Sequence, residues 1–150
     1  MPAQTLEAKM TTLEENKEAV RRLVYEDLNT DNRDAANDIV AEEFVDHTNP
    51  PHLKYGLENH KEIVRIFRAA FPDLEFIIED MIAEGDKVVV RMPFRGTHTG
   101  DFFGIPATGK QVYVEGVHIL RVANGKIAEH WGSNDDLGLM RQLGVLPEGM

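Results

Sequence analysis

The spacing of apolar residues changes once along the chain, shortly after residue 71. Up to that point apolar positions recur every three or four residues, the period of a helix packed on a core. This pattern predicts helices over residues 13–29, 34–43 and 57–71. Thr12 and Glu15 have the spacing of a capping box, which sets the start of the first helix.

Two stretches of this first half do not follow the helical pattern. Residues 1–12 show no periodicity, and we expect a flexible tail that precedes one domain over residues 13–150. Residues 44–47 have the pattern of a short extended piece. Pro50 and Pro51 follow it and end any regular structure.

Beyond the third helix, apolar and polar residues alternate, which is the period of a strand with one buried face. Strands are predicted over residues 74–83, 87–98, 110–123 and 126–134, and a short helix over residues 136–143. Three helices followed by four hairpin-linked strands predict an α+β fold with the helices on one side of an antiparallel sheet. Such a sheet twists and curves, so we expect a cone whose concave side the N-terminal helices close around a single deep pocket.

His118 is the lone titratable residue on one face of its predicted strand. The other residues of that face are Val112, Val114, Gly116, Leu120 and Val122. Burial in such surroundings favours the neutral form of a histidine, which could then act as an acid, a base or a hydrogen-bond donor. The competing interpretation is a core histidine satisfied by one hydrogen bond.

The neighbours of His118 depend on the turn at Asn124-Gly125 that joins the last two strands. A two-residue turn pairs His118 with Trp131 and brings Ser133 and Asp135 to the same face.

A three-residue turn with a glycine bulge gives the other register. It pairs His118 with His130 and brings Gly132 to that face instead. One residue of shift reverses the face, so the sequence leaves both registers open.

Several residues near strand ends are candidates for the pocket wall. Asp46 and His47 precede the proline-rich loop, where functional groups often lie, although a solvated loop histidine is the simpler interpretation of His47. His98 lies beside a glycine-rich turn, where it could line the rim of the pocket or be exposed. Phe94 and Trp131 are expected in the core or the cavity wall.

Two adjacent aspartates precede the final helix, and either could be its N-cap. For Asp135, a cap and a pocket carboxylate are equally good interpretations. For Asp136, we favour the cap.

Composition and charge exclude several classes of protein. The 150 residues carry a net charge of −10, which repels phosphate backbones, so we expect no nucleic acid partner. The chain has no cysteine, and none of its six histidines has the spacing of metal ligands, so we expect no metal. No signal peptide or apolar run of membrane-spanning length is present, and we expect a cytoplasmic protein that does not bind membranes.

Three segments resemble one known family. They are residues 96–109 (GTHTGDFFGIPATG), 117–127 (VHILRVANGKI) and 136–144 (DLGLMRQLG). They are similar to the SnoaL-like polyketide cyclases of the nuclear-transport-factor-2-like (ketosteroid isomerase-like) superfamily, and the resemblance covers about residues 15–145. It implies the α+β cone and a homodimer formed through the outer face of the sheet. It also implies ring closure of an aromatic polyketide methyl ester by intramolecular aldol condensation, without metal or cofactor.

The resemblance implies three catalytic positions, of which this chain keeps one. His118 matches the family histidine, which assists at the enolate. The family glutamine, two residues before it, is Gly116, and the family aspartate, the general acid/base fourteen residues after it, is Gly132. If the family places both of these residues in the pocket, the register with the bulge is the right one, and His130 also faces the pocket.

We therefore predict a cofactor-independent enzyme of cyclase or isomerase type acting on a small hydrophobic, polyketide-like carbonyl compound. The predicted catalytic residues are His118 and Asp135, and the predicted substrate-binding residues are Asp46, His47, His98, His130, Trp131 and Phe94. The missing aspartate and glutamine favour an alternative, a non-catalytic small-molecule binding module. A second alternative is a hydrolase or hydroxylase relative of the same superfamily, with a water-activating carboxylate inside the cavity.

Overall fold

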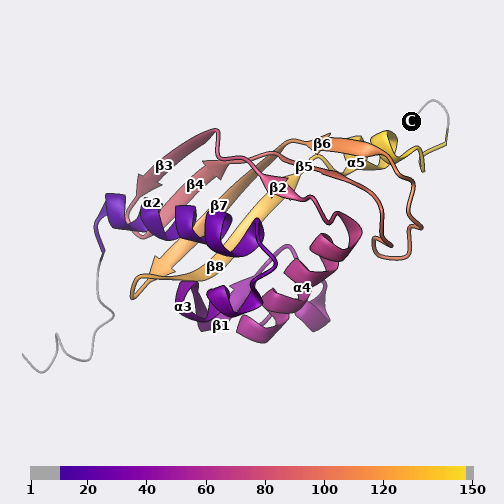
Figure 1. The fold of residues 1–150 in the computed structure, drawn as a ribbon. Coiled ribbons are helices and arrows are strands. Elements are labelled where there is room, and N and C mark those ends of the chain that lie inside the picture. Colours follow the sequence, from indigo (N-terminus) through magenta and orange to yellow (C-terminus); the bar gives the residue numbers. More distant parts are fainter. Residues whose placement is uncertain (1–10, 148–150) are drawn as a thin grey trace, which may run out of the picture.

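The computed structural model describes residues 11–147 and has an α+β architecture (Figure 1). In chain order its elements are α2 (Leu13–Arg22), the π-helical turn η1 (Leu23–Leu28), the 3-10 helix η2 (Arg33–Ala35), α3 (Ala36–Ile39), β1 (Val40–Asp46), the 3-10 helix η3 (Pro51–Leu53), α4 (Leu57–Ala70), β2 (Glu75–Phe76), β3 (Asp80–Glu84), β4 (Lys87–Arg91), β5 (Phe94–Thr97), β6 (Gln111–Val114), β7 (Gly116–Ala123), β8 (Lys126–Asn134) and α5 (Asp136–Leu143).

The predicted start of the first helix is confirmed. The Thr12 hydroxyl accepts a hydrogen bond from the Glu15 amide, and the Glu15 carboxylate accepts one from the Thr12 amide, each at 3.1 Å. Of the predicted tail, residues 1–10 lie outside the described part of the chain. Among residues 11–147, no helix is both long and apolar enough to cross a membrane.

The predicted second helix is too long, and the difference changes the sheet. The helical part ends at Ile39, and residues 40–46 form strand β1, which pairs parallel with β8. The wholly antiparallel sheet predicted from the sequence is therefore wrong. The sheet is mixed, with strand order β1-β8-β7-β4-β3, and a separate three-stranded sheet has the order β2-β5-β6.

Three of the four predicted long strands break where the chain passes from one sheet to the other. The breaks fall at residues 77–79, 92–93 and 115. Pro93, which cannot donate to a ladder, stands at one of them. Pairing continues across the breaks, because the amide of Met92 donates to the Gly116 carbonyl and that of Ile77 to the Pro93 carbonyl.

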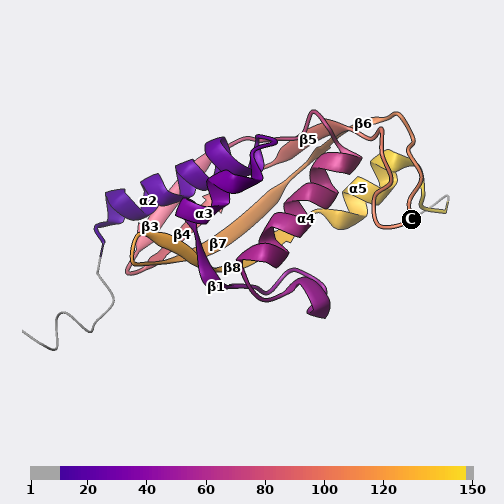
Figure 2. The ribbon, with the colours of Figure 1, turned by 60° about the horizontal axis from the view of Figure 1, so that its bottom comes forward.

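Helices α2, α3 and α4 lie on one side of the larger sheet, and α5 lies beside β6 of the smaller sheet, as Figures 1 and 2 show. The main core forms between α2, η1, α3 and this sheet, and its fully buried residues include Val20, Val24, Val88, Val90 and Ile127. A second core forms where α4 and α5 meet the smaller sheet, around Phe71, Phe94, Phe102, Val114 and Leu139. The α+β class and the position of the helices are thus as the sequence predicted.

A bulge in β8 decides the register that the sequence left open. The turn itself has two residues, with positive φ at both Asn124 and Gly125, and Ala123 pairs with Lys126. Val122 then pairs with Ile127 but Arg121 pairs with Glu129, so Ala128 is an extra residue in β8.

The extra residue moves every later position of β8 to the opposite face. His118 therefore pairs with Gly132, and Leu120 pairs with His130. Neither predicted pairing of His118 occurs, but the set of residues on its face is that of the second register. His130 and Gly132 face the cavity side, whereas Trp131 pairs with Ile119 on the other side.

Candidate active site

A cavity of about 530 Å³ lies between α4, η1 and the cavity-facing side of β7 and β8. Its apolar lining residues are Leu23, Leu28, Phe44, Ile63, Val64, Phe67, Leu74, Phe76, Met92, Phe102, Phe103 and Leu120, and its polar ones include Asp46, His47, Thr48, Asn49, His60, His118, His130, Ser133, Asn134 and Asp136. This size and a mostly apolar wall with a few polar groups are typical of small-molecule sites.

Four of the polar residues form a continuous hydrogen-bonded chain. His130 Nδ1 donates to Asp46 Oδ1 over 2.9 Å. His130 Nε2 and His118 Nδ1 share a hydrogen bond of 2.8 Å, and His118 Nε2 lies 3.2 Å from Asn134 Oδ1. We call this chain, Asp46–His130–His118–Asn134, the relay.

Strand pairing builds the relay. The parallel ladder between β1 and β8 sets Asp46 beside His130, and the antiparallel ladder between β7 and β8 sets His118 beside Gly132. Asp46 is the last residue of β1, so its side chain also accepts from the amide and hydroxyl of Thr48, at 2.9 and 2.6 Å. A carboxylate held by several donors on a rigid strand fixes the orientation of the imidazole that it contacts.

The hydrogen bonds of the relay allow two arrangements of the protons. With the Asn134 oxygen facing it, His118 Nε2 is a donor, so Nδ1 of the neutral ring accepts from His130 Nε2. His130 then donates from both nitrogens and is an imidazolium beside the Asp46 carboxylate. If the Asn134 amide turns over, its NH2 group donates to His118 Nε2, and the same chain holds one proton fewer. The relay thus has two well-bonded states that differ by one proton.

Burial and neighbouring groups shift the pKa values of two relay residues, His118 and Asp46. His118 is 4% exposed, and burial, together with the neighbouring charge of His130, lowers its pKa from 6.5 to about 4. For Asp46, burial acts to raise the pKa, but the hydrogen bond and charge of His130 and the bonds from Thr48 outweigh it and lower the pKa. A negative charge is therefore held on Asp46, and the His118 imidazole is kept neutral.

Two glycines create the space that the relay fills. A Cβ atom at residue 132 would overlap His118 Nδ1 and lie 3.0 Å from His130 Nε2. A Cβ atom at residue 116 would overlap Asn134 Oδ1 and lie 3.0 Å from His118 Nε2. These are the two positions where the family resemblance implied an aspartate and a glutamine. In this chain the His130 and Asn134 side chains occupy the room that those glycines leave.

Asp135, the predicted catalytic carboxylate, is not part of this arrangement. It is exposed, it is the N-cap of α5, and its Oδ1 accepts from the Gly138 amide at 2.9 Å. It does not line the cavity. Of the two interpretations left open for Asp135, the structure shows the cap, whereas Asp136, for which the cap was favoured, is the first residue of the helix and lies at the cavity.

His47 lies at the cavity, and Trp131 lies behind it. Their rings are stacked, with centroids 5.0 Å apart and planes 8° apart. His47 Nε2 is 2.6 Å from a Glu129 carboxylate oxygen, and Arg121 donates to the other oxygen of Glu129 at 2.8 Å. His47 thus has two partners on β8 and is not a freely solvated loop histidine, while Trp131 supports it from the outer face.

His98 and Phe94 lie away from the cavity. His98 is fully buried, its Nδ1 accepts from the Thr108 amide at 3.2 Å, and its ring packs on Phe71. Phe94 belongs to the second core. Neither residue lines the cavity, so the prediction that they bind substrate is not supported by their positions.

The structure adds residues that the sequence argument did not select. Asn134 ends the relay, Thr48 donates to the Asp46 carboxylate, and His60 lines the cavity from α4. His60 could have been found, because it precedes Ile63, Val64 and Phe67 at helical spacing on a buried face. Within residues 11–147 there is no group of three histidines or carboxylates placed to hold a metal ion.

Comparison with known proteins identifies the family. The model of the SnoaL-like polyketide cyclases matches residues 18–143. The aklanonic acid methyl ester cyclase DauD of Streptomyces sp. (strain C5) is 33% identical over an alignment of 139 residues, and the match covers 87% of this chain and 84% of that protein. The nogalonic acid methyl ester cyclase of Streptomyces nogalater is 33% identical over 104 residues, 66% of this chain and 78% of that protein.

The fold agrees with this match. The solved structure of TsrD from Streptomyces laurentii superimposes with a TM-score of 0.83 at 29% identity, covering 91% of this chain and 99% of that one. The chain therefore belongs to the SnoaL-like polyketide cyclase family, as its sequence motifs indicated.

Proposed function

We propose that the protein catalyses a cofactor-independent intramolecular aldol cyclisation of a hydrophobic, polyketide-like carbonyl compound. The observation that carries the proposal is the pair of contacts from Asp46 through His130 to His118, at 2.9 and 2.8 Å, on the wall of an otherwise largely apolar cavity. The family relatives named above are methyl ester cyclases, which makes aromatic polyketide methyl esters the first substrates to consider.

In this mechanism His118 Nε2 removes a proton from the carbon next to a substrate carbonyl. The electrons of that C–H bond form the new C–C bond to the second carbonyl carbon, and its oxygen takes up a proton to become a hydroxyl. No atom is gained or lost overall, so the product is an isomer of the substrate. The base must be the form of the relay with one proton fewer, in which the Nε2 lone pair gives up its hydrogen bond from the Asn134 amide to take the substrate proton.

With a pKa of about 4, His118 by itself would be a weak base at neutral pH. The relay makes proton removal easier because His118 does not have to keep the positive charge. As Nε2 takes the substrate proton, Nδ1 passes its own proton to His130 Nε2. The positive charge then lies on His130 beside the Asp46 carboxylate, and His118 stays neutral. Its new Nε2–H can donate to the enolate oxygen, or to the Asn134 oxygen once the amide has turned back to the orientation in which that oxygen lies 3.2 Å from Nε2.

Turnover of aklanonic acid methyl ester and nogalonic acid methyl ester tests the proposal. Liquid chromatography with mass spectrometry should detect a product of unchanged mass and altered retention. In D2O the substrate should exchange its acidic C–H for deuterium, and His118→Gln should abolish both signals. Saturable binding of either ester without product or exchange would instead favour the binding-module alternative.

We also propose that the outer face of the larger sheet is covered by a second copy of the chain. Ile82 pairs with Val89, Val89 with Ile119, and Ile119 with Trp131, which gives a row of apolar side chains across four strands. Ile82 is 68% exposed in the single chain. Light scattering should report a dimer that Ile82→Lys weakens, and a monomer at micromolar concentration would contradict this part of the proposal.

A further inference from the structure

His60 is the isolated polar group on the helical wall of the cavity. The other cavity-lining residues of α4 are Ile63, Val64 and Phe67, and the neighbouring wall is formed by Leu23, Leu28 and Phe44. His60 is 5% exposed, and its ring packs edge-on against Phe44 with centroids 5.3 Å apart. The relay residues come from β1, β7 and β8, so His60 belongs to a different wall of the same cavity.

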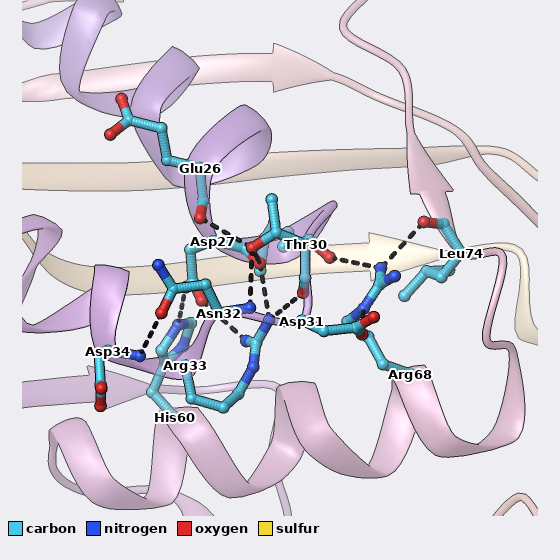
Figure 3. Close-up of polar contacts among 11 residues, drawn as sticks. Glu26, Asp27, Thr30, Asp31, Asn32, Arg33, Asp34, His60, Arg68 and Leu74 are labelled. Carbon is cyan, nitrogen blue, oxygen red and sulfur yellow. Dashed lines mark hydrogen bonds and ion pairs between the residues drawn. The ribbon is translucent and has the colours of Figure 1, made fainter.

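A buried carboxylate orients the His60 ring. His60 Nε2 donates to Asp27 Oδ2 over 2.6 Å, and Asp27 is fully buried (Figure 3). Asp27 lies in the π-helical turn η1, a distortion that often occurs at functional sites.

Arg33 fixes the position of Asp27 through hydrogen bonds to its side chain and its backbone. Its guanidinium donates to Asp27 Oδ1 at 2.8 Å and to the Asp27 carbonyl at 2.9 Å, and it also contacts the Thr30 carbonyl (Figure 3). Both carboxylate oxygens of Asp27 therefore have a cationic or N–H partner. A purely structural role would be served as well by apolar residues of similar volume, because buried ion pairs contribute little net stability.

The arrangement leaves one ring nitrogen for a ligand. Nε2 is committed to Asp27, and Nδ1 has no hydrogen-bond partner among residues 11–147. A carboxylate orients His130 in the same way, because Asp46 accepts a hydrogen bond from His130 as Asp27 does from His60. The cavity therefore contains two carboxylate-oriented histidine systems on different walls.

We propose that His60 is a second proton-handling residue of the cavity, which binds a carbonyl or phenolic oxygen of the ligand through Nδ1, with Asp27 and Arg33 as its positioning residues. The reaction step rests on the proposed function. As the relay removes the proton from carbon, an imidazolium Nδ1–H of His60 gives a proton to the oxygen of the attacked carbonyl. One proton is gained at the relay and one is lost at His60, and exchange with water restores both.

The test uses a stable probe, 1,8-dihydroxyanthraquinone, and the full chain labelled with 15N. Long-range 1H–15N spectra should show a shift of the His60 Nδ1 resonance at saturating probe and none for His52, which is exposed. His60→Gln should weaken probe binding by about tenfold, the loss of one hydrogen bond, and His52→Gln should leave it unchanged. If His60→Gln does not fold, the shift of the His60 Nδ1 resonance in the wild-type protein still tests whether the probe contacts this ring.

The outcomes separate this proposal from the cyclase proposal. A shift of His60 Nδ1 without turnover of either methyl ester would overturn the cyclase and keep His60 as a ligand contact. With turnover, His60→Gln should lower kcat more than it raises KM. An unmoved Nδ1 resonance at high probe concentration, or unchanged probe affinity and kcat in a folded His60→Gln protein, would overturn the role of His60.

Discussion

His118 Nδ1 lies 2.8 Å from His130 Nε2, and the chain permits this contact because residue 132, opposite His118, has no side chain. The contact links the buried carboxylate of Asp46 to the imidazole that faces the cavity. It also gives this chain a proton acceptor that does not depend on a carboxylate at residue 132.

Removing the charge at the far end of the relay should disable catalysis without unfolding the protein. Asp46→Asn keeps an acceptor for His130 Nδ1 but no longer stabilises the imidazolium. We expect isomer formation from the methyl esters to fall by roughly 10²–10⁴-fold, the usual contribution of general acid–base catalysis. Steady-state kinetics would measure this, with Asp38→Asn, an exposed change on α3, as the control. Full activity in Asp46→Asn would rule out the relay.

The two glycines offer a matched pair of substitutions. In Gly132→Ala the new methyl group would separate His118 from His130, so activity should fall about as far as in Asp46→Asn. In Gly116→Ala the methyl group would displace the Asn134 amide and leave the contact between the histidines in place. We expect the smaller loss there. Equal losses in the two variants would show that Asn134 matters as much as the link to His130.

The lowered pKa of His118 makes stability depend on pH. Below about pH 6.5 the unfolded chain protonates this histidine, whereas the folded protein does so only near pH 4. Protons therefore favour the unfolded chain in this window, and stability falls as the pH is lowered through it. The loss is about 3 kcal/mol for this group, on the order of 1.4 kcal/mol per pKa unit.

Urea denaturation of wild type and His118→Gln at pH 7 and pH 4 measures this loss. The free energy of unfolding of wild type should fall by about 3 kcal/mol more than that of the variant. Contributions of the carboxylates, including Asp46, cancel in the difference between the two proteins. Parallel losses in both would mean that His118 is not protonated differently in the folded and unfolded states.

Asp135 should prove to be structural. Asp135→Ala removes the acceptor of the Gly138 amide at the start of α5 and should cost about 1 kcal/mol of stability, while turnover at 20 °C is unchanged. Asp135→Asn, which keeps the cap, should restore the stability. Thermal melts and initial rates of the two variants separate the cap from catalysis. A loss of turnover in a stable Asp135→Asn protein would return this residue to the catalytic set.

The sequence predicted the helices and the α+β class because these follow from local periodicity. The first helix is an example, since the capping box at Thr12 and Glu15 is a local signal that the structure reproduces. Strand β1 was only partly predicted, because residues 44–46 were expected to be extended but residues 40–43 were assigned to the second helix. Residues 40–46 pair parallel with β8, more than 80 positions later in the chain, and no local pattern reports a partner that distant.

The relay was only partly predictable. His118 stood out as a titratable residue on an apolar strand face, but its neighbours depended on one bulged residue, Ala128, which has no sequence signature of its own. Asp46 was a candidate from its place before a proline-rich loop, yet its contact with His130 comes from the parallel ladder. Asp27 is a polar residue on the otherwise apolar face of the first predicted helix, and only the tertiary structure gives it His60 as a partner.

The close fit around residue 132 has a consequence for how the family can diversify. A side chain there and a His118–His130 contact exclude each other, so the two ways of supplying a base cannot coexist in one protein. A lineage that changes from a carboxylate at residue 132 to the His118–His130 contact must therefore lose the carboxylate before the contact can form. Glycine at 132, histidine at 130 and aspartate at 46 should accordingly be inherited together, and this three-residue signature would let homologous sequences be sorted by the kind of base they carry.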